Sequence, residues 1–163
     1  RVNILQPGPG VGGHCIAIDP WFIVDSAPEQ AKLILAARNI NDARPDYVAR
    51  QVMEKAAGLK QPVIACLGLA FKAGIGDCRE SPAVKVVQKL ARLGIGRILT
   101  VEPYNEGLPE ELQGVPGMEE CSLSEALSLA NIVVLLVEHP LFSQVDRELL
   151  KGKVVIDTRG MWR

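Results

Sequence analysis

Short apolar runs alternate with helix-forming segments along residues 63–163, and this alternation constrains the fold more than any other feature of the sequence. The run VIACLGLAF (Val63–Phe71) is continuously apolar, which is typical of a parallel strand covered on both faces. Three later segments are also predicted to be strands: RILTVEP (Arg97–Pro103), IVVLLVEH (Ile132–His139) and KVVIDTRG (Lys153–Gly160).

Helix signals lie between these predicted strands. The segment Ser81–Gly94 begins with Ser81 in an N-cap position and Pro82 at the first helical position. Ser122–Ala130 and Leu141–Leu150 are also predicted to be helical. Strands that alternate with helices predict an α/β fold with a doubly wound parallel sheet and right-handed crossovers. Ligands of such sheets bind at the carboxyl ends of the strands.

The first part of the chain, residues 1–57, is predicted to be a glycine-rich loop followed by helix. Apolar residues recur at helical spacing from Ala27 to Ala57. Pro45 interrupts this pattern, so it either kinks one long helix or starts a second one, with Asn41 or Asp42 as the cap.

Charge and composition argue against several classes of partner. The formal net charge is -1 and no basic run stands out, so neither nucleic acid nor an anionic membrane is expected as a partner. No apolar stretch reaches the roughly 20 residues of a membrane span, and no secretory signal is visible. The four cysteines form no C-x-x-C pair, and His14 and His139 are far apart, so no metal site is predicted. A reduced, cytoplasmic setting is expected.

A glycine-rich motif, QPGPGVGGHCIAIDP, lies close to the start of the chain. Gly8, Gly10 and Gly13 satisfy the dinucleotide fingerprint G-x-G-x-x-G. That fingerprint requires a helix that begins within the glycines, whereas HCIAIDP is predicted to be extended and to be stopped by Pro20. The sequence therefore disfavours a cofactor phosphate cradle at this motif.

The same motif contains a candidate nucleophile, Cys15. The thiol follows a loop with few side chains, which a ligand can approach closely, and it lies beside His14 and four residues before Asp19. Most free cysteines, however, are small buried hydrophobic residues. Spacing alone leaves both interpretations of Cys15 open.

Three segments resemble a known family. The first, GPGVGGHCIAIDPWFIV, resembles the cysteine motif of the nucleotide-sugar dehydrogenases, the UDP-glucose/GDP-mannose dehydrogenase family. The form with His before the cysteine and DPWF after it is similar to the branch that acts on UDP-N-acetyl-D-mannosamine. The resemblance continues in GLAFKAGIGDCRESPA and in the closing VVIDTRGMWR, in the same order.

The resemblance implies a two-part organisation. Residues 1–57 would carry the cysteine loop and the end of a helical central dimerisation domain, and residues 58–163 would form a Rossmann-like UDP-sugar-binding domain. Because the chain begins at Arg1 without methionine, we expect a C-terminal piece of a longer protein whose NAD domain precedes it. NAD would be bound mainly by that domain, and the helix 27–57 would form a homodimer.

The family's chemistry implies roles for two residues of the motif. UDP-N-acetyl-D-mannosamine would be oxidised twice at C6 to UDP-N-acetyl-D-mannosaminuronate, with Cys15 carrying a thiohemiacetal and then a thioester. Asp19 would position or activate water. A lysine and an asparagine that the family also uses lie upstream, so the chain alone is expected to be inactive.

The resemblance also implies substrate contacts at the carboxyl ends of strands. Phe71 and Lys72 follow the first predicted strand, and Arg159 follows the last. A lysine supplies a point charge for a diphosphate and a phenyl ring supplies an apolar face. Gly12 is expected to contact the substrate as well. The alternatives are a solvated lysine and a core phenylalanine.

Three further residues are candidates for ligand contacts. His14 either shapes the pocket for an N-acetylated sugar or only packs beside the loop. The resemblance implies that Arg1 reaches the substrate of the partner subunit and that Arg79 contacts NAD. The alternative for Arg79 is an ion pair with Asp77 or Glu80.

Other readings of the whole chain remain open at this stage. It could belong to a sister dehydrogenase that acts on UDP-glucose, UDP-N-acetylglucosamine or UDP-N-acetylgalactosamine. It could also be a non-catalytic module that binds a nucleotide sugar or mediates dimerisation.

Overall fold

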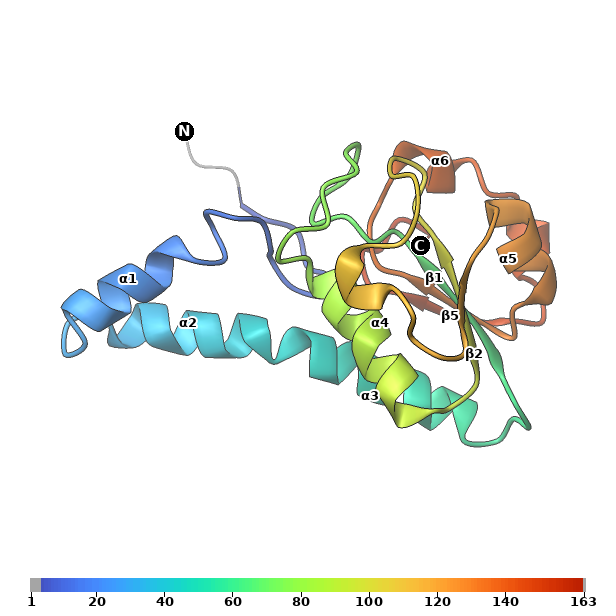
Figure 1. Cartoon of the computed structure of the whole chain (residues 1–163), viewed down its shortest axis with the longest axis horizontal. Helices are drawn as coiled ribbons and strands as arrows, with labels where there is room; N and C mark the ends of the chain where they lie inside the picture. Colours follow the sequence, from blue (N-terminus) through green and yellow to red (C-terminus); the bar gives the residue numbers. More distant parts are fainter. Residues whose placement is uncertain (1–3, 163) are drawn as a thin grey trace.

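A five-stranded parallel sheet forms the body of the molecule, and a helical arm extends from it (Figure 1). The computed structural model describes residues 4–162. The strand order is β3-β2-β1-β4-β5, and every neighbouring pair is parallel. The strands are β1 (Val63–Leu67), β2 (Arg97–Val101), β3 (Met118–Glu120), β4 (Ile132–Leu135) and β5 (Val154–Asp157).

Helices connect the strands and cover both faces of the sheet. Helix α4 (Pro82–Leu93) joins β1 to β2, and α5 (Leu123–Leu129) joins β3 to β4. The α4 helix is capped as predicted: the Ser81 side chain accepts a hydrogen bond from the Ala83 amide. Gly94 ends α4 in the left-handed conformation. The predicted doubly wound α/β fold is confirmed.

Successive strand residues point to opposite faces, so the sheet has two hydrophobic cores. Ile64 and Cys66 of β1 pack toward α3 and α4. Leu67 of β1 faces the other side, where it joins Phe142 and Trp162. Burial on both faces explains why the central strands read as continuous apolar runs.

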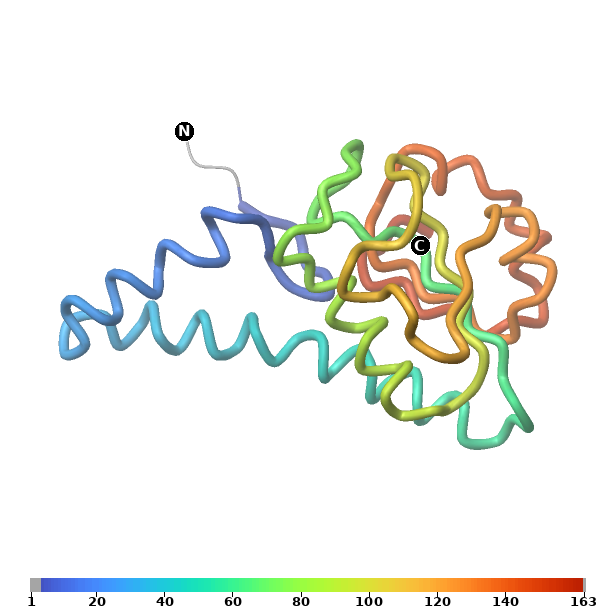
Figure 2. Tube along the Cα trace, in the orientation of Figure 1, coloured from blue at the N-terminus to red at the C-terminus, as the bar shows by residue number. Residues whose placement is uncertain are grey.

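The helical region from Ala27 to Ala57 differs from the sequence-based expectation. Helices α2 (Lys32–Asp42) and α3 (Arg44–Ala56) continue in almost the same direction, separated by Ala43 (Figure 2). The pattern that starts at Ala27 is therefore two helices, and the predicted caps are wrong because Asn41 and Asp42 lie inside α2. Pro45 lies in the first turn of α3, where the backbone nitrogen has no acceptor within the helix, so the missing N–H of proline costs no hydrogen bond.

The segment after Cys15 is helical rather than extended. Residues 14–18 form turns that lead into α1 (Asp19–Ser26), which packs against α2. The prediction that Pro20 stops an extended segment is wrong, because Pro20 lies in the first turn of α1, where its fixed φ suits a helix.

The remaining differences involve short elements. The predicted helix Leu141–Leu150 is divided into α6 (Pro140–Ser143) and a 3-10 turn (Arg147–Leu150), which the Asp146 side chain caps. Strand β3 was not predicted, because it is a short edge strand whose two glutamates are exposed. A second 3-10 turn spans Glu110–Leu112.

Helix α3 belongs to the packing of the sheet. Its buried residues, among them Val48 and Val52, share one core with Ile64 of β1 and Leu90 of α4. Only α1 and α2 extend away from the body in Figure 1. The division of the chain at residues 57/58 stays a prediction. Among residues 4–162, no helix is both long enough and apolar enough to cross a membrane.

Candidate functional site

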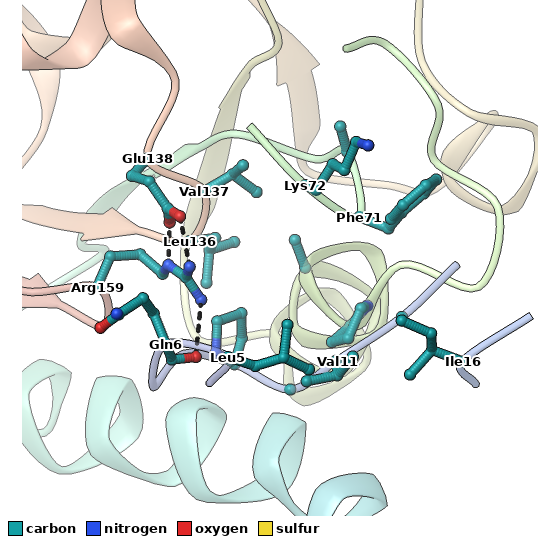
Figure 3. Close-up of a pocket in the computed structure, with 16 residues that line it drawn as sticks. Leu5, Gln6, Val11, Ile16, Phe71, Lys72, Leu136, Val137, Glu138 and Arg159 are labelled. Carbon is teal, nitrogen blue, oxygen red and sulfur yellow. Dashed lines mark hydrogen bonds and ion pairs between the residues drawn. The ribbon is translucent and has the colours of Figure 1, made fainter. Parts of the chain in front are cut away.

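A cleft of about 160 Å³ lies at the carboxyl ends of β1, β4 and β5 (Figure 3). Four parts of the sheet domain line it: the loops after β1 and β4, the first turn of α4, and the residue Arg159 after β5. The glycine-rich loop closes it from the other side with residues between Leu5 and Ile16. The cleft is smaller than the roughly 300–1,000 Å³ of a pocket that encloses a drug-sized ligand, so it would enclose part of a larger one.

Arg159 crosses one side of the cleft. Its Nε and Nη2 donate to the two carboxylate oxygens of Glu138, which forms a bidentate ion pair. Its Nη1 also donates to the carbonyl oxygen of Gln6 at 3.4 Å, as Figure 3 shows. The Arg159 side chain is 16% exposed, so it is ordered by partners within the cleft. Sequence reasoning did not identify Glu138.

The backbone that carries Arg159 is held by Asp157, the last residue of β5. One oxygen of the Asp157 carboxylate accepts from the amides of Arg159 at 3.0 Å and Gly160 at 2.7 Å. The other oxygen accepts from the Trp162 amide at 2.7 Å. Trp162 is itself buried, with its indole nitrogen donating to the Phe142 carbonyl at 2.9 Å.

Phe71 and Lys72 lie across the cleft from Arg159, in the loop after β1 (Figure 3). Phe71 is half-buried, and its amide donates to the Asp77 carbonyl at 2.9 Å. Lys72 is exposed and forms no salt bridge within the part of the chain that the structure describes. Its ammonium group is therefore available to an anionic ligand.

The glycines let the loop lie against the sheet domain. A side chain at Gly12 would overlap the carbonyl oxygen of Glu80 and approach Cδ of Pro82 at 2.5 Å. Gly13 has a φ of +92°, and a Cβ there would lie 3.0 Å from the Phe71 ring. The loop thus needs its glycines for contacts with its own chain, in addition to any contact with a ligand.

Cys15 is exposed, and all four cysteines are free thiols. Its carbonyl oxygen accepts from the amides of Ile18 at 2.9 Å and Asp19 at 2.8 Å. These bonds form one helical turn, and residues four apart in such a turn share a face. Cys15 and Asp19 are therefore close, but neither lines the cleft; their neighbours Gly12 and Ile16 do.

His14 and Arg79 lie outside the cleft lining as well. Arg79 forms an ion pair with Asp77 at 2.6 Å, which is the alternative that the sequence left open. Hydrogen bonds from Arg79 lower the pKa of Asp77 to about 2, and the charge of His14 contributes a smaller part. Arg1 lies outside the described residues.

A buried polar pair, which the sequence analysis did not identify, supports the loop after β1. Glu102 follows β2, and one carboxylate oxygen accepts from the amides of Leu69 at 2.7 Å and Ala70 at 3.0 Å. The same oxygen is 3.2 Å from Nε2 of His139, which follows β4. Nδ1 of His139 accepts from the Gly74 amide at 3.1 Å, so the ring proton is on Nε2 and points at Glu102.

The pKa of Glu102 is lowered despite its burial. Burial opposes the charged carboxylate, but the hydrogen bonds from His139, Leu69 and Ala70 outweigh it and lower the pKa below the ordinary 4.5. A usable signal in the sequence was the position of both residues at the carboxyl ends of predicted apolar strands. Within residues 4–162, no group of three or more His, Cys, Asp or Glu side chains could hold a metal ion.

Comparison with known proteins agrees with this arrangement. Residues 65–163 match the sequence profile of the "UDP-glucose/GDP-mannose dehydrogenase family, UDP binding domain", and residues 1–43 match that of the family's central domain. The chain belongs to the UDP-glucose/GDP-mannose dehydrogenase family. The cleft of this family member lies where these two matched regions meet.

Relatives of this family member carry two kinds of name. It is 59% identical over 162 residues to an NDP-N-acetyl-D-galactosaminuronic acid dehydrogenase of Ralstonia nicotianae, covering 99% of this chain and 38% of the relative. It is 46% identical over 171 residues to a UDP-N-acetyl-D-mannosamine dehydrogenase of Salmonella typhi, covering 100% of this chain and 40% of the relative.

A solved structure from the same family has a similar fold. The UDP-D-ManNAc dehydrogenase of Pyrococcus horikoshii superimposes with a TM-score of 0.80 at 35% sequence identity, covering 100% of this chain and 38% of that one. The chain thus spans about two fifths of the length of the relatives it matches.

Proposed function

We propose that this chain provides the nucleotide-sugar site and the cysteine loop of an NAD-dependent dehydrogenase that oxidises UDP-N-acetyl-D-mannosamine twice at C6, giving the uronate. The observation that carries the proposal is the cleft itself. Two cationic residues from the sheet edge, Lys72 and Arg159, line a space that is closed by the loop containing Cys15.

The cleft suits the diphosphate end of such a ligand. Lys72 and Arg159 carry two positive charges against the one negative charge of Glu138, so the lining favours an anion. The Phe71 ring supplies an apolar surface beside them, and the backbone of Gly12 supplies a wall without a side chain. We assign four of these residues to substrate binding: Gly12, Phe71, Lys72 and Arg159.

We assign the second oxidation to Cys15. The Cys15 sulfur forms a bond to C6 of the aldehyde while the aldehyde oxygen takes up a proton, which gives a thiohemiacetal. Loss of a hydride from C6 and of the hydroxyl proton gives a thioester, and water then cleaves the bond between carbon and sulfur, releasing the carboxylate, the thiol and a proton. We assign the positioning of that water to Asp19, whose amide donates to the Cys15 carbonyl oxygen one helical turn away.

The described residues fit one contact to NAD and do not fit a complete dinucleotide site. Dinucleotide-binding folds place an acidic side chain on the ribose after the second strand. Glu102 occupies that position, but it is only 7% exposed, and its carboxylate already accepts hydrogen bonds from the amides of Leu69 and Ala70. Arg79 is more suitable: its side chain is 69% exposed, so it would contact a cofactor held elsewhere. NAD, when bound, supplies the hydride acceptor.

The helical arm favours a homodimer. Large apolar side chains on α1 and α2 are exposed, including Phe22 at 70%, Leu33 at 81% and Ile40 at 67%. A surface of this kind is typical of a protein interface.

Two further assignments accompany the homodimer. We assign to Arg1 a contact with the substrate of the partner subunit. We also keep the cytoplasm as the compartment, because free thiols suit a reducing environment.

A galactosamine substrate is the second candidate, because the relative at 59% identity is named for the galactosaminuronic acid. We propose that His14, beside the reactive thiol, contributes to the choice of sugar. Turnover of UDP-N-acetylmannosamine and UDP-N-acetylgalactosamine by wild type and His14→Ser tests this. An unchanged preference in the variant would remove the specificity role.

The main experiment uses the full-length protein with NAD+ and a panel of UDP-sugars that includes UDP-glucose and UDP-N-acetylglucosamine. We expect two NADH for each N-acetylhexosamine oxidised. Cys15→Ala should retain the first oxidation and lose the second. A variant that still yields two NADH for each sugar would contradict the role of Cys15. Residues 1–163 expressed alone should produce no NADH.

A further inference from the structure

The side-chain amide of Asn41, on α2, forms hydrogen bonds with both the backbone N–H and the backbone carbonyl of Val11 in the cysteine loop. Its Oδ1 accepts from the Val11 amide at 2.7 Å, and its Nδ2 donates to the Val11 carbonyl at 3.1 Å. The side-chain amide therefore pairs with Val11 as a neighbouring strand would. Gly10 and Gly13, on either side of Val11, have φ values of +135° and +92°. Because glycine is conformationally permissive, this loop needs an external constraint to adopt one conformation.

Arg38 holds the loop on the other side of Cys15. Its Nη1 donates to the Ile16 carbonyl at 3.4 Å, and its Nη2 donates to Asp42 Oδ1 at 2.6 Å. Arg38 is only 8% exposed, so the guanidinium has few alternative partners. Asp42 Oδ1 also accepts from Asn41 Nδ2 at 3.2 Å, so one carboxylate orients both side chains that contact the loop.

The contacts follow one another in a regular order. Arg38 and Asn41 are three residues apart on one helix, and Arg44, three residues further, donates through Nε to the Gly8 carbonyl at 3.4 Å. Their partners run in the opposite direction along the loop, from Ile16 to Gly8. The loop thus lies antiparallel to the arm, and Cys15 falls between the contacts made by Asn41 and Arg38.

We propose that Asn41 and Arg38 are positioning residues for the Cys15 sulfur, an inference that rests on the role proposed above for Cys15. Neither side chain bonds to the thiol; each fixes the backbone beside it. A displacement of about 1 Å can cost about 100-fold in rate when a nucleophile must meet a bound carbon. The first oxidation does not use Cys15, so only the second should depend on the two residues.

The experiment compares the two oxidations in the full-length protein. The substrates are the UDP-N-acetylhexosamine and its C6 aldehyde, which enters the reaction directly at the second oxidation. For Asn41→Ala we expect kcat on the aldehyde to fall about 10- to 100-fold. We expect its KM to stay within about twofold and the single-turnover rate of the first oxidation to stay unchanged. Asn39→Ala is the matched control, because Asn39 is an exposed residue of the same helix.

Hydrogen exchange provides a readout that needs no activity. The Val11 amide should exchange at least about 10-fold faster in Asn41→Ala, while the amides of α2 keep their protection. Alkylation of Cys15 by iodoacetamide should change by less than about threefold, because the thiol is exposed in either case. Arg38→Lys is the second variant. It keeps a positive charge beside Asp42 but lacks the second guanidinium nitrogen, which donates to the Ile16 carbonyl.

Several results would overturn the proposal. These are an unchanged aldehyde kcat, an equal loss in both oxidations, or an unchanged Val11 exchange rate. If Asn41→Ala does not fold, the same criteria apply to Arg38→Lys, with exchange measured at Ala17 and Ile18. A wild-type protein that oxidises neither substrate would instead remove the proposed function, and the exchange data would still decide whether Asn41 holds the loop.

Discussion

Glu102 and His139 form a hydrogen-bonded pair, 3.2 Å apart, whose side chains are 1% and 0% exposed. They follow different strands, β2 and β4, and they accept hydrogen bonds from the amides of Leu69, Ala70 and Gly74 in the loop after β1. Three strand ends are therefore tied together at the edge of the sheet that carries the cleft. The loop with Lys72 is shaped from inside the protein, before any ligand contributes.

Acid should destabilise the protein through Glu102. Its pKa is lower in the folded state than the ordinary 4.5, so the folded state favours the ionised carboxylate. The stabilisation is complete above about pH 4.5 and is lost as the pH falls through the lowered folded-state value. Urea unfolding between pH 3 and pH 7 should show a declining free energy of unfolding below pH 4.5. The decline should be smaller in Glu102→Gln, and an equal slope would assign the acid sensitivity to other carboxylates.

Removal of His139 should cost stability at neutral pH. His139→Leu leaves a buried carboxylate without its imidazole partner and the Gly74 amide without an acceptor. We expect a loss of about 3 kcal/mol in the free energy of unfolding. The matched control is His14→Leu, where the histidine is exposed and the change should stay below about 0.5 kcal/mol. Equal effects of the two substitutions would contradict the importance of the buried pair.

A methyl group at Gly12 should displace the cysteine loop. The Cβ of Gly12→Ala would overlap the Glu80 carbonyl, and backbone cannot rotate away as a flexible side chain does. We expect a loss of about 1–3 kcal/mol in the free energy of unfolding, with faster proteolysis of the loop. Gly58→Ala is the control, because nothing lies within 4 Å of a Cβ at that position. The two variants should therefore differ in thermal melting.

Lys72 should contribute to nucleotide affinity and little to stability. In Lys72→Met the exposed ammonium is lost from the cleft, and the dissociation constant for UDP should rise about 10-fold or more at low salt. Lys60→Met removes an exposed lysine from a loop outside the cleft lining and should leave UDP affinity unchanged. Titration calorimetry at two salt concentrations checks both, and equal affinities in the two variants would exclude Lys72 from the binding site.

The strands and helices of the sheet could be predicted because their side chains have one dominant environment. The β1 run is apolar since both of its faces are buried, and Ser81 caps α4 by a local hydrogen bond. The sequence analysis does not predict helix α1, because it treats Pro20 as the end of an extended segment. A proline in the first turn instead favours a helix. Edge strand β3 lacks an apolar pattern altogether.

The candidate site was only partly accessible from the sequence. Phe71, Lys72 and Arg159 could be placed at one edge because the carboxyl ends of parallel strands meet there. The partners of those residues depend on loop geometry. Glu138 bonds Arg159 across 21 residues and Asn41 bonds Val11 across 30, and no local spacing encodes such pairs.

Asp157 fixes the backbone of Arg159 through the amides beside it, while Glu138 holds the guanidinium. A ligand that meets Arg159 therefore finds the cation already engaged, and binding becomes an exchange of one anion for another. A monoanion gains little from such an exchange, because it replaces a carboxylate of equal charge. A doubly charged diphosphate gains more, so the ion pair itself selects for charge.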